Sequence, residues 1–191
     1  MIWGRPAVIC SCRGGSEISD NATQLYDEDF VRWTEEQAQA LRQAAELATN
    51  LSLDWANLAE EIDSLGRSQS RELGSRIAVV IEHLIKLETS PAIEPRSGWI
   101  DTIGRERRDI EDLLNDSPSL RSGVAGMIAR EMPRTIRLVA RSLRNRGETN
   151  PETIARIERV SYAEEQILGD WFPGDAPLPA DGERDQRASN G

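Results

Sequence analysis

The side chains best suited to chemistry in this sequence are its only histidine, His83, and a pair of neighbouring glutamates. An imidazole titrates close to neutral pH and therefore serves in acid–base catalysis or as a metal ligand. On a helix, Glu61 borders Leu58 and Leu65. Its neighbour Glu60 lies about 100° further around the helix. Glu61 is predicted either to point inward and meet a cation, or to cover a solvated flank together with Glu60.

A metal site would have to be built around the lone histidine. Dinuclear carboxylate bundles use two Glu-x-x-His motifs, but Glu82 directly precedes His83 and therefore faces elsewhere. One histidine with two or three carboxylates can hold a single metal ion. A divalent ion at Glu61 and His83 is therefore the one cofactor hypothesis, and otherwise we expect no cofactor. The alternative is a structural histidine bonded to a glutamate or to a backbone carbonyl.

An arginine extends this candidate site. Arg107 lies one helical turn from Ile103 and from Ile110, so its side chain is expected to reach inward. A buried guanidinium needs a partner, and Glu61 is the candidate carboxylate. The candidate polar cluster comprises Glu60, Glu61, His83 and Arg107.

Arginines also form a continuous stripe along one helix, at successive spacings of four, three, four and three residues. Its members are Arg130, Arg134, Arg137, Arg141 and Arg144. Such a stripe can bind an acidic protein or a phosphate backbone, or it can pair internally with Glu131 or with the acidic helices nearer the N-terminus. It lacks interleaved aromatic residues for base stacking. The net charge of −10 also argues against a nucleic-acid partner.

Other catalytic signatures are missing, and no catalytic residue is assigned. The sequence has no Gly-x-Ser-x-Gly elbow, no Walker phosphate loop and no dinucleotide-binding glycine pattern. The only cysteines, Cys10 and Cys12, stand one residue apart, which suits neither a disulfide framework nor a four-ligand metal site. Whether the chain is an enzyme stays open at this point.

These residues must be positioned by helices, because apolar residues recur at spacings of three and four and no alternating strand pattern occurs. The first helix is expected to begin after an Asp27 cap. The line of residues on its inward face is Phe30, Trp33, Gln37, Leu41, Ala44 and Ala48. Four later helices are expected, at about 54–88, 97–115, 119–144 and 151–169. The helix at 54–88 is expected to be long or kinked at Gly66. The helix at 119–144 is expected to kink at Pro133. The predicted fold is all-α, an antiparallel four- to five-helix bundle.

The ends of the chain differ from its middle. Residues 1–22 lack a helical period and contain glycines, serines and both cysteines, so we expect a disordered leader or a mis-called start. Residues 173–191 are rich in proline, glycine and charge, which predicts a disordered tail. Residues 23–172 are expected to form a single domain. No apolar run reaches the roughly 20 residues that span a bilayer, so no membrane partner is expected. The two cysteines fit a reduced compartment, so a cytoplasmic location is expected.

Five sets of residues match one known family. They are Tyr26 to Phe30 with Trp33-Thr34; Leu53 to Trp55 with Asn57 to Ile62 and Leu65 to Ser68; Glu82 to Lys86; Trp99, Ile103 and Arg107-Arg108 with Asp116 to Arg121; and Tyr162 with Glu165 to Leu168 and Phe172-Pro173. In combination they resemble the bacterial domain-of-unknown-function family numbered twenty-nine. The resemblance implies a bacterial, all-helical protein. It implies no activity, substrate or cofactor.

Two functions from different classes follow. The first is a non-enzymatic cytoplasmic protein-interaction or regulatory module whose partner, another protein or a second copy of this chain, uses the arginine stripe or an exposed apolar strip. The second is an enzyme or ligand-binding bundle with a polar or metal site near Glu61, His83 and Arg107. An enclosed polar pocket would favour the second, and an exposed patch would favour the first.

Overall fold

The structure is a computed structural model that describes residues 23–47, 51–90, 95–147 and 150–174. The predictions for residues 1–22 and 175–191, Cys10 and Cys12 included, lie outside these residues. All regular elements in the described ranges are helical, which confirms the all-α fold class. Within the described part of the chain, no helix is both long and apolar enough to cross a membrane.

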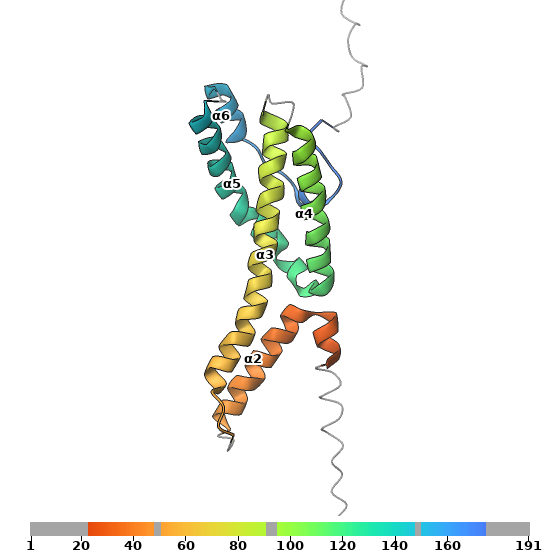
Figure 1. The fold of residues 1–191 in the computed structure, drawn as a ribbon, viewed down its shortest axis with the longest axis vertical. Helices are drawn as coiled ribbons and strands as arrows, with labels where there is room; N and C mark the ends of the chain where they lie inside the picture. The colour runs from red at the N-terminus through yellow and green to blue at the C-terminus, as the bar shows by residue number, and fades with distance from the viewer. Residues whose placement is uncertain (1–22, 48–50, 91–94, 148–149, 175–191) are drawn as a thin grey trace, which may run out of the picture. The chain divides into compact units, whose positions relative to one another are not determined.

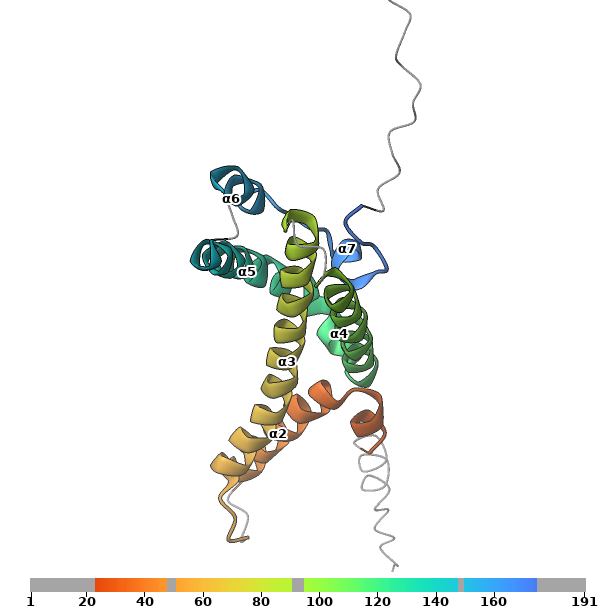
Figure 2. The same ribbon diagram turned by 45° about the horizontal axis from the view of Figure 1, so that its top comes forward.

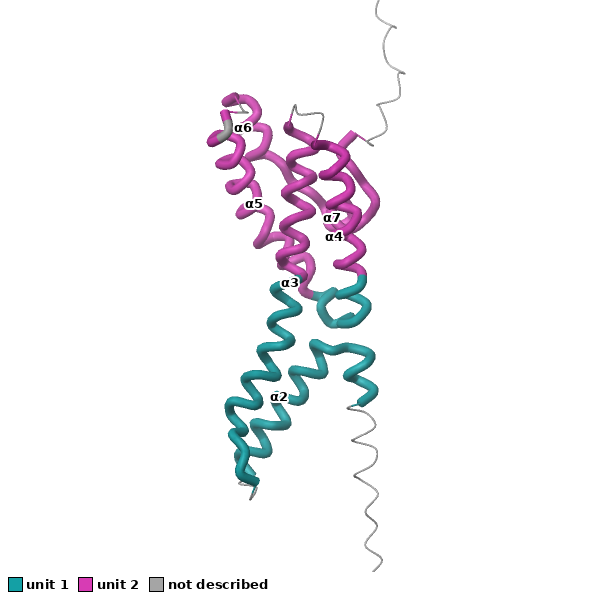
Figure 3. The backbone as a smooth tube through the Cα atoms, in the orientation of Figure 1, with its two compact units in different colours: residues 1–72, 112–122 teal, residues 73–111, 123–191 magenta. Residues whose placement is uncertain are grey.

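Residues 23–28 form a short helical stretch ahead of the first labelled helix (Figure 1). The elements that follow are α2 (Phe30–Glu46), α3 (Trp55–Thr89), α4 (Arg96–Asp116), the 3-10 helix η1 (Pro118–Gly123), α5 (Val124–Arg146), α6 (Pro151–Ile157) and α7 (Glu164–Leu168). The chain divides into two compact units (Figure 3). Unit 1 is Met1–Glu72 with Asp112–Ser122, and unit 2 is Leu73–Glu111 with Gly123–Gly191.

The predicted long helix is confirmed as α3, which runs without interruption through Gly66. Asp54 caps it as expected, since its carboxylate accepts a hydrogen bond from the Asn57 backbone N–H at 3.2 Å. Gly66 does not end the helix, and it has a role in packing. A Cβ at position 66 would overlap the Thr34 hydroxyl of α2, so this glycine lets two helices of unit 1 approach closely.

The close approach decides which face of α2 is buried. Figures 1 and 2 show α2 alongside the first part of α3. Its buried residues are Val31, Thr34 and Ala38, whereas the described residues of the predicted inward line, which include Phe30 and Trp33, are half-buried. Ala48, the last residue of that line, lies outside the described residues. That prediction was wrong because small side chains, not large ones, fit against a glycine in the facing helix. The predicted Asp27 cap was also wrong, since α2 is capped by Asp29.

Buried polar groups join the three segments of unit 1. The Asp29 carboxylate accepts hydrogen bonds from the Arg32 N–H at 3.0 Å and from the Ser119 N–H at 2.7 Å and hydroxyl at 2.9 Å. The buried Ser117 hydroxyl donates to Gln69 of α3 at 2.9 Å and accepts from the Val31 N–H at 3.3 Å. These bonds attach η1 and the segment before it to α2 and to α3.

The core of unit 2 is aliphatic and comes from five helices. Its fully buried side chains include Leu73, Ile77, Ile81, Leu84 and Ile85 of α3, Ile103 and Ile110 of α4, Val124 and Val139 of α5, Ile157 of α6 and Ile167 of α7. Burying such side chains is worth roughly 1.5–3 kcal/mol each. The second half of α3 therefore contributes the largest share of this core.

The predicted final helix, residues 151–169, is two short helices instead. Residues 158–163 leave the helical path between α6 and α7. Tyr162 is buried there, and its hydroxyl donates to Glu88 at 2.8 Å. Its ring also lies 5.8 Å from that of Trp171. This tertiary contact, invisible in the helical period, explains the interruption.

Candidate functional site

The two glutamates of the candidate cluster lie on unit 1 and are exposed. Glu60 forms an ion pair with Arg67 at 2.5 Å. Glu61 has no ion pair with any described residue, and it stands between Leu58 and Leu65, which are 41% and 48% exposed. The apolar neighbours of Glu61 are therefore open to solvent, so this part of α3 presents a patch rather than an enclosed pocket.

His83 is half-buried in unit 2 and bonds to its own helix. Its Nδ1 lies 2.8 Å from the carbonyl oxygen of Val79, one turn earlier. Since a carbonyl can only accept, Nδ1 carries a hydrogen and donates it to this carbonyl. This geometry matches the structural alternative given by the sequence, a histidine bonded to a backbone carbonyl.

Arg107 reaches inward as predicted and is only 9% exposed. Its Nε donates to the Ile167 carbonyl at 2.9 Å, and its Nη2 donates to the carbonyls of Gln166 at 2.7 Å and Trp171 at 2.8 Å. The guanidinium also lies 5.0 Å from the centre of the Phe172 ring. Gln166 and Ile167 belong to the last turn of α7, whose carbonyls have no partner within the helix. Arg107 therefore caps α7 and holds the segment after it.

Burial lowers the pKa of the Arg107 guanidinium from its ordinary value, and the charge of Asp170 acts in the opposite direction. An arginine nevertheless keeps its proton in proteins, so the group bonds these carbonyls as a cation. Three carbonyl oxygens stand where the sequence suggested a carboxylate.

The cluster of Glu61, His83 and Arg107 as a whole stays a prediction, since Glu61 belongs to unit 1 and the other two to unit 2. The metal hypothesis at Glu61 and His83 also stays a prediction. Among the described residues, no group of three or more histidine, cysteine, aspartate or glutamate side chains is arranged to hold a metal ion.

The arginine stripe lies on the exposed face of α5, in unit 2. Arg130 and Arg134 bond to Glu131 at 2.9 Å and 3.3 Å, which is the internal pairing that the sequence offered as an alternative. Arg144 contacts Glu158, the residue that follows α6, at 3.6 Å. These pairs are more than half exposed on the arginine side, so each is worth at most about 1 kcal/mol.

The arginines in the middle of the stripe differ from those at its ends in their ion pairing. Arg137 and Arg141 are exposed and have no ion pair with any residue in the described ranges. Between them lies Leu138, which is 63% exposed. With Arg134 these residues line a pocket of about 310 Å³. We call these four residues, Arg134, Arg137, Leu138 and Arg141, the α5 patch.

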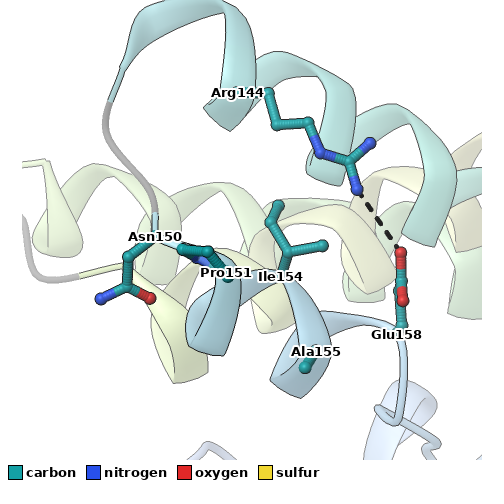
Figure 4. Close-up of a pocket in the computed structure, with 6 residues that line it drawn as sticks. All are labelled: Arg144, Asn150, Pro151, Ile154, Ala155 and Glu158. Atoms are coloured by element: carbon teal, nitrogen blue, oxygen red, sulfur yellow. Dashed lines mark ion pairs between the residues drawn. The ribbon is translucent and has the colours of Figure 1, made fainter.

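A second pocket of about 450 Å³ lies between the end of α5 and α6 (Figure 4). It is lined by Arg144, Asn150, Pro151, Ile154, Ala155 and Glu158. The ion pair between Arg144 and Glu158 is drawn at one side, with Ile154 beside it. Both charged groups already satisfy each other, so this pocket offers less free charge than the α5 patch.

Leu138 is not among the residues predicted from the sequence, although its position on the helix indicates an exposed apolar residue. The buried line of α5 runs through Ile128, Val139 and Leu143. Leu138 is out of phase with that line and stands one turn from both Arg134 and Arg141. A large apolar residue on the polar face of an amphipathic helix is the pattern that identifies the patch.

Comparisons with known proteins give a family and a fold. The chain is similar to a crystallised α-helical protein of unknown function from Rhodospirillum rubrum ATCC 11170, with 20% identity and a TM-score of 0.61 over 77% of this chain and 90% of the other. No curated protein matches the chain significantly. A family model described as "Domain of unknown function DUF29" matches residues 25–172. The chain therefore belongs to the DUF29 family, an assignment that confirms the resemblance seen in the sequence.

Proposed function

We propose that this chain is a non-enzymatic protein-interaction module that uses the α5 patch to bind an acidic helical segment of a protein partner. The observation that carries the proposal is the pair of exposed arginines, Arg137 and Arg141, without an ion pair in the described ranges, on either side of the exposed Leu138. Interfaces join an apolar anchor to a charged surround in this way. The pocket of about 310 Å³ accommodates one apolar side chain of the partner.

The chemistry of the partner follows from the patch. Unpaired guanidinium groups favour carboxylates, which they bind with two parallel hydrogen bonds. An amphipathic helix that carries leucine and glutamate one turn apart on the same face matches the spacing of the α5 patch. The proposal keeps the cytoplasmic location expected from the sequence, for which the near absence of cysteine is the support.

A binding experiment tests this function. The probe is a fluorescein-labelled synthetic helix with one leucine flanked on both sides by glutamates, and binding to the full chain is followed by fluorescence anisotropy. We expect saturable binding at low salt, weakened at least about tenfold by R137E/R141E. The matched control R105E/R108E changes the net charge equally on exposed arginines of α4, and it should leave binding unchanged.

The opposite results would refute the proposal. These are no saturable binding at low salt, or equal loss of binding in both double variants. Equal loss would mean that only the net charge matters. A probe with glutamines in place of the glutamates should bind poorly to the wild-type chain, which separates carboxylate recognition from simple apolar contact.

A further inference from the structure

A patch on α3 has the complementary chemistry to the α5 patch. Leu58, Glu61 and Leu65 lie within about 60° of one another on the helix, and all three are exposed. We call them the α3 patch. It offers one carboxylate between two leucines, whereas the α5 patch offers one leucine among three arginines. The α3 patch is acidic and the α5 patch is basic, and each also exposes leucine.

The charges of the surrounding elements extend this complementarity. The segment from Asp20 to Leu65 contains eleven acidic residues and two arginines, whereas α5 contains six arginines and one glutamate. Opposite potentials steer two surfaces together and fix their register, even where single exposed ion pairs add little affinity.

The apolar part of the α3 patch also lacks cover. Leu51 and Leu53, just before α3, are 63% and 50% exposed, and Leu47 at the end of α2 is 78% exposed. Leu58 and Leu65 add to these exposed leucines of unit 1. Exposed apolar patches of this kind mark interaction surfaces.

The geometry points to a second copy of this chain as the partner: the α3 patch of one copy docks on the α5 patch of another, with Glu61 between Arg137 and Arg141 and a leucine in the pocket beside Leu138. This inference rests on the proposed function, for which it names the partner. Because the two patches differ, the contact is heterologous. A dimer therefore keeps one free patch of each kind, the α5 patch on one copy and the α3 patch on the other, unless a ring closes.

The heterologous contact allows a sharp test on the full chain. E61Q removes the carboxylate of the α3 patch and leaves the α5 patch intact, whereas R137E/R141E reverses the charge of the α5 patch and leaves the α3 patch intact. Light scattering after size-exclusion chromatography gives the mass at about 20 mM and about 300 mM salt, where the screening length falls from roughly 20 Å to below about 6 Å. We expect wild type to exceed the monomer mass of 21.3 kDa at low salt and to lose this association at high salt.

The variants should behave as complementary halves. Each variant alone is expected to associate at least about tenfold more weakly than wild type. An equimolar mixture of the two should form a one-to-one dimer through the two patches that remain intact, with twice the monomer mass. The matched controls are E111Q and R105E/R108E, which make the same changes of charge on exposed residues of α4. They should associate like wild type.

Three results would overturn the inference: a wild-type chain that stays monomeric at low salt, a patch variant that associates like wild type, or a mixture of the two variants that stays monomeric. If the acidic helical probe still binds the α5 patch in such a case, the proposed function stands and only the choice of partner is wrong. If the probe also fails to bind, both fail together.

Discussion

Arg107 donates hydrogen bonds to three backbone carbonyls of unit 2 that lie about 60 residues later in the chain. Its three hydrogen bonds and its place over the Phe172 ring fix residues 166–172 on α4. Lysine keeps the charge but lacks the planar fork that reaches three carbonyls at once. R107K should therefore lower the free energy of unfolding by about 2 kcal/mol, because buried carbonyls lose their donors.

Urea denaturation measures this loss, and hydrogen exchange locates it. We expect faster exchange in α7 and in the segment that follows it. R108K is the matched control, since Arg108 is exposed and next in sequence. If R107K and R108K lowered the free energy of unfolding equally, the carbonyl contacts of Arg107 would not stabilise the fold.

Tyr162 provides a pH-dependent contribution. Burial, the hydrogen bond to Glu88 and the charge of Glu88 raise the pKa of the Tyr162 phenol. The neutral phenol is favoured in the folded chain, so its contribution is complete below the unfolded pKa of about 10 and is lost as pH rises above it. Y162F should cost about 1 kcal/mol at pH 7. This cost should shrink in chemical denaturation above about pH 10, and a cost that stays constant with pH would contradict the assignment.

The sequence reading of individual residues succeeded where neighbours on one helix determine the outcome. The inward direction of Arg107 followed from Ile103 and Ile110 on its own helix. The identity of its partners did not follow, because Gln166, Ile167 and Trp171 lie about 60 residues away and bind through backbone atoms. A sequence pattern carries no signal for which backbone carbonyls end near a side chain.

At the scale of the elements, Gly66 fixes how α2 meets α3. G66A would gain up to about 1 kcal/mol of helix propensity, but its methyl group would overlap the Thr34 hydroxyl. We expect a net loss of about 1–2 kcal/mol in urea denaturation. T34A/G66A should recover most of that loss, because it removes the obstructing hydroxyl. G104A is the control, since nothing lies within 4 Å of a Cβ there, and it should be neutral or stabilising.

The helices themselves were largely predictable, and their contacts were not. The Asp54 cap and the regular apolar spacing of α3 are local signals, so its extent was predicted closely. The buried face of α2 was misassigned because Phe30 and Trp33 are more hydrophobic than Thr34 and Ala38. Hydrophobicity alone cannot reveal that the facing helix carries a glycine. The division of α6 from α7 likewise depends on Glu88, 74 residues from Tyr162.

At the scale of the whole molecule, the metal content of the purified chain distinguishes the two functions predicted from the sequence, an interaction module and a bundle with a metal site. The interaction module predicts that the purified chain carries no stoichiometric transition metal, as measured by elemental analysis after dialysis without chelator. A stoichiometric metal that is lost in both E61Q and H83A would instead favour the metal site at Glu61 and His83. E111Q serves as the control for a change of charge elsewhere.

The hydrogen bonds between Asp29 and Ser119 also set an order of events during synthesis. Ninety residues separate the two, so a ribosome adding about 5–20 residues per second needs roughly 5 to 20 s to pass from one to the other. During that interval the carboxylate that begins α2 lacks its later donors, and unit 1 lacks η1. The N-terminal helices thus complete their fold only after the middle of the chain has been made.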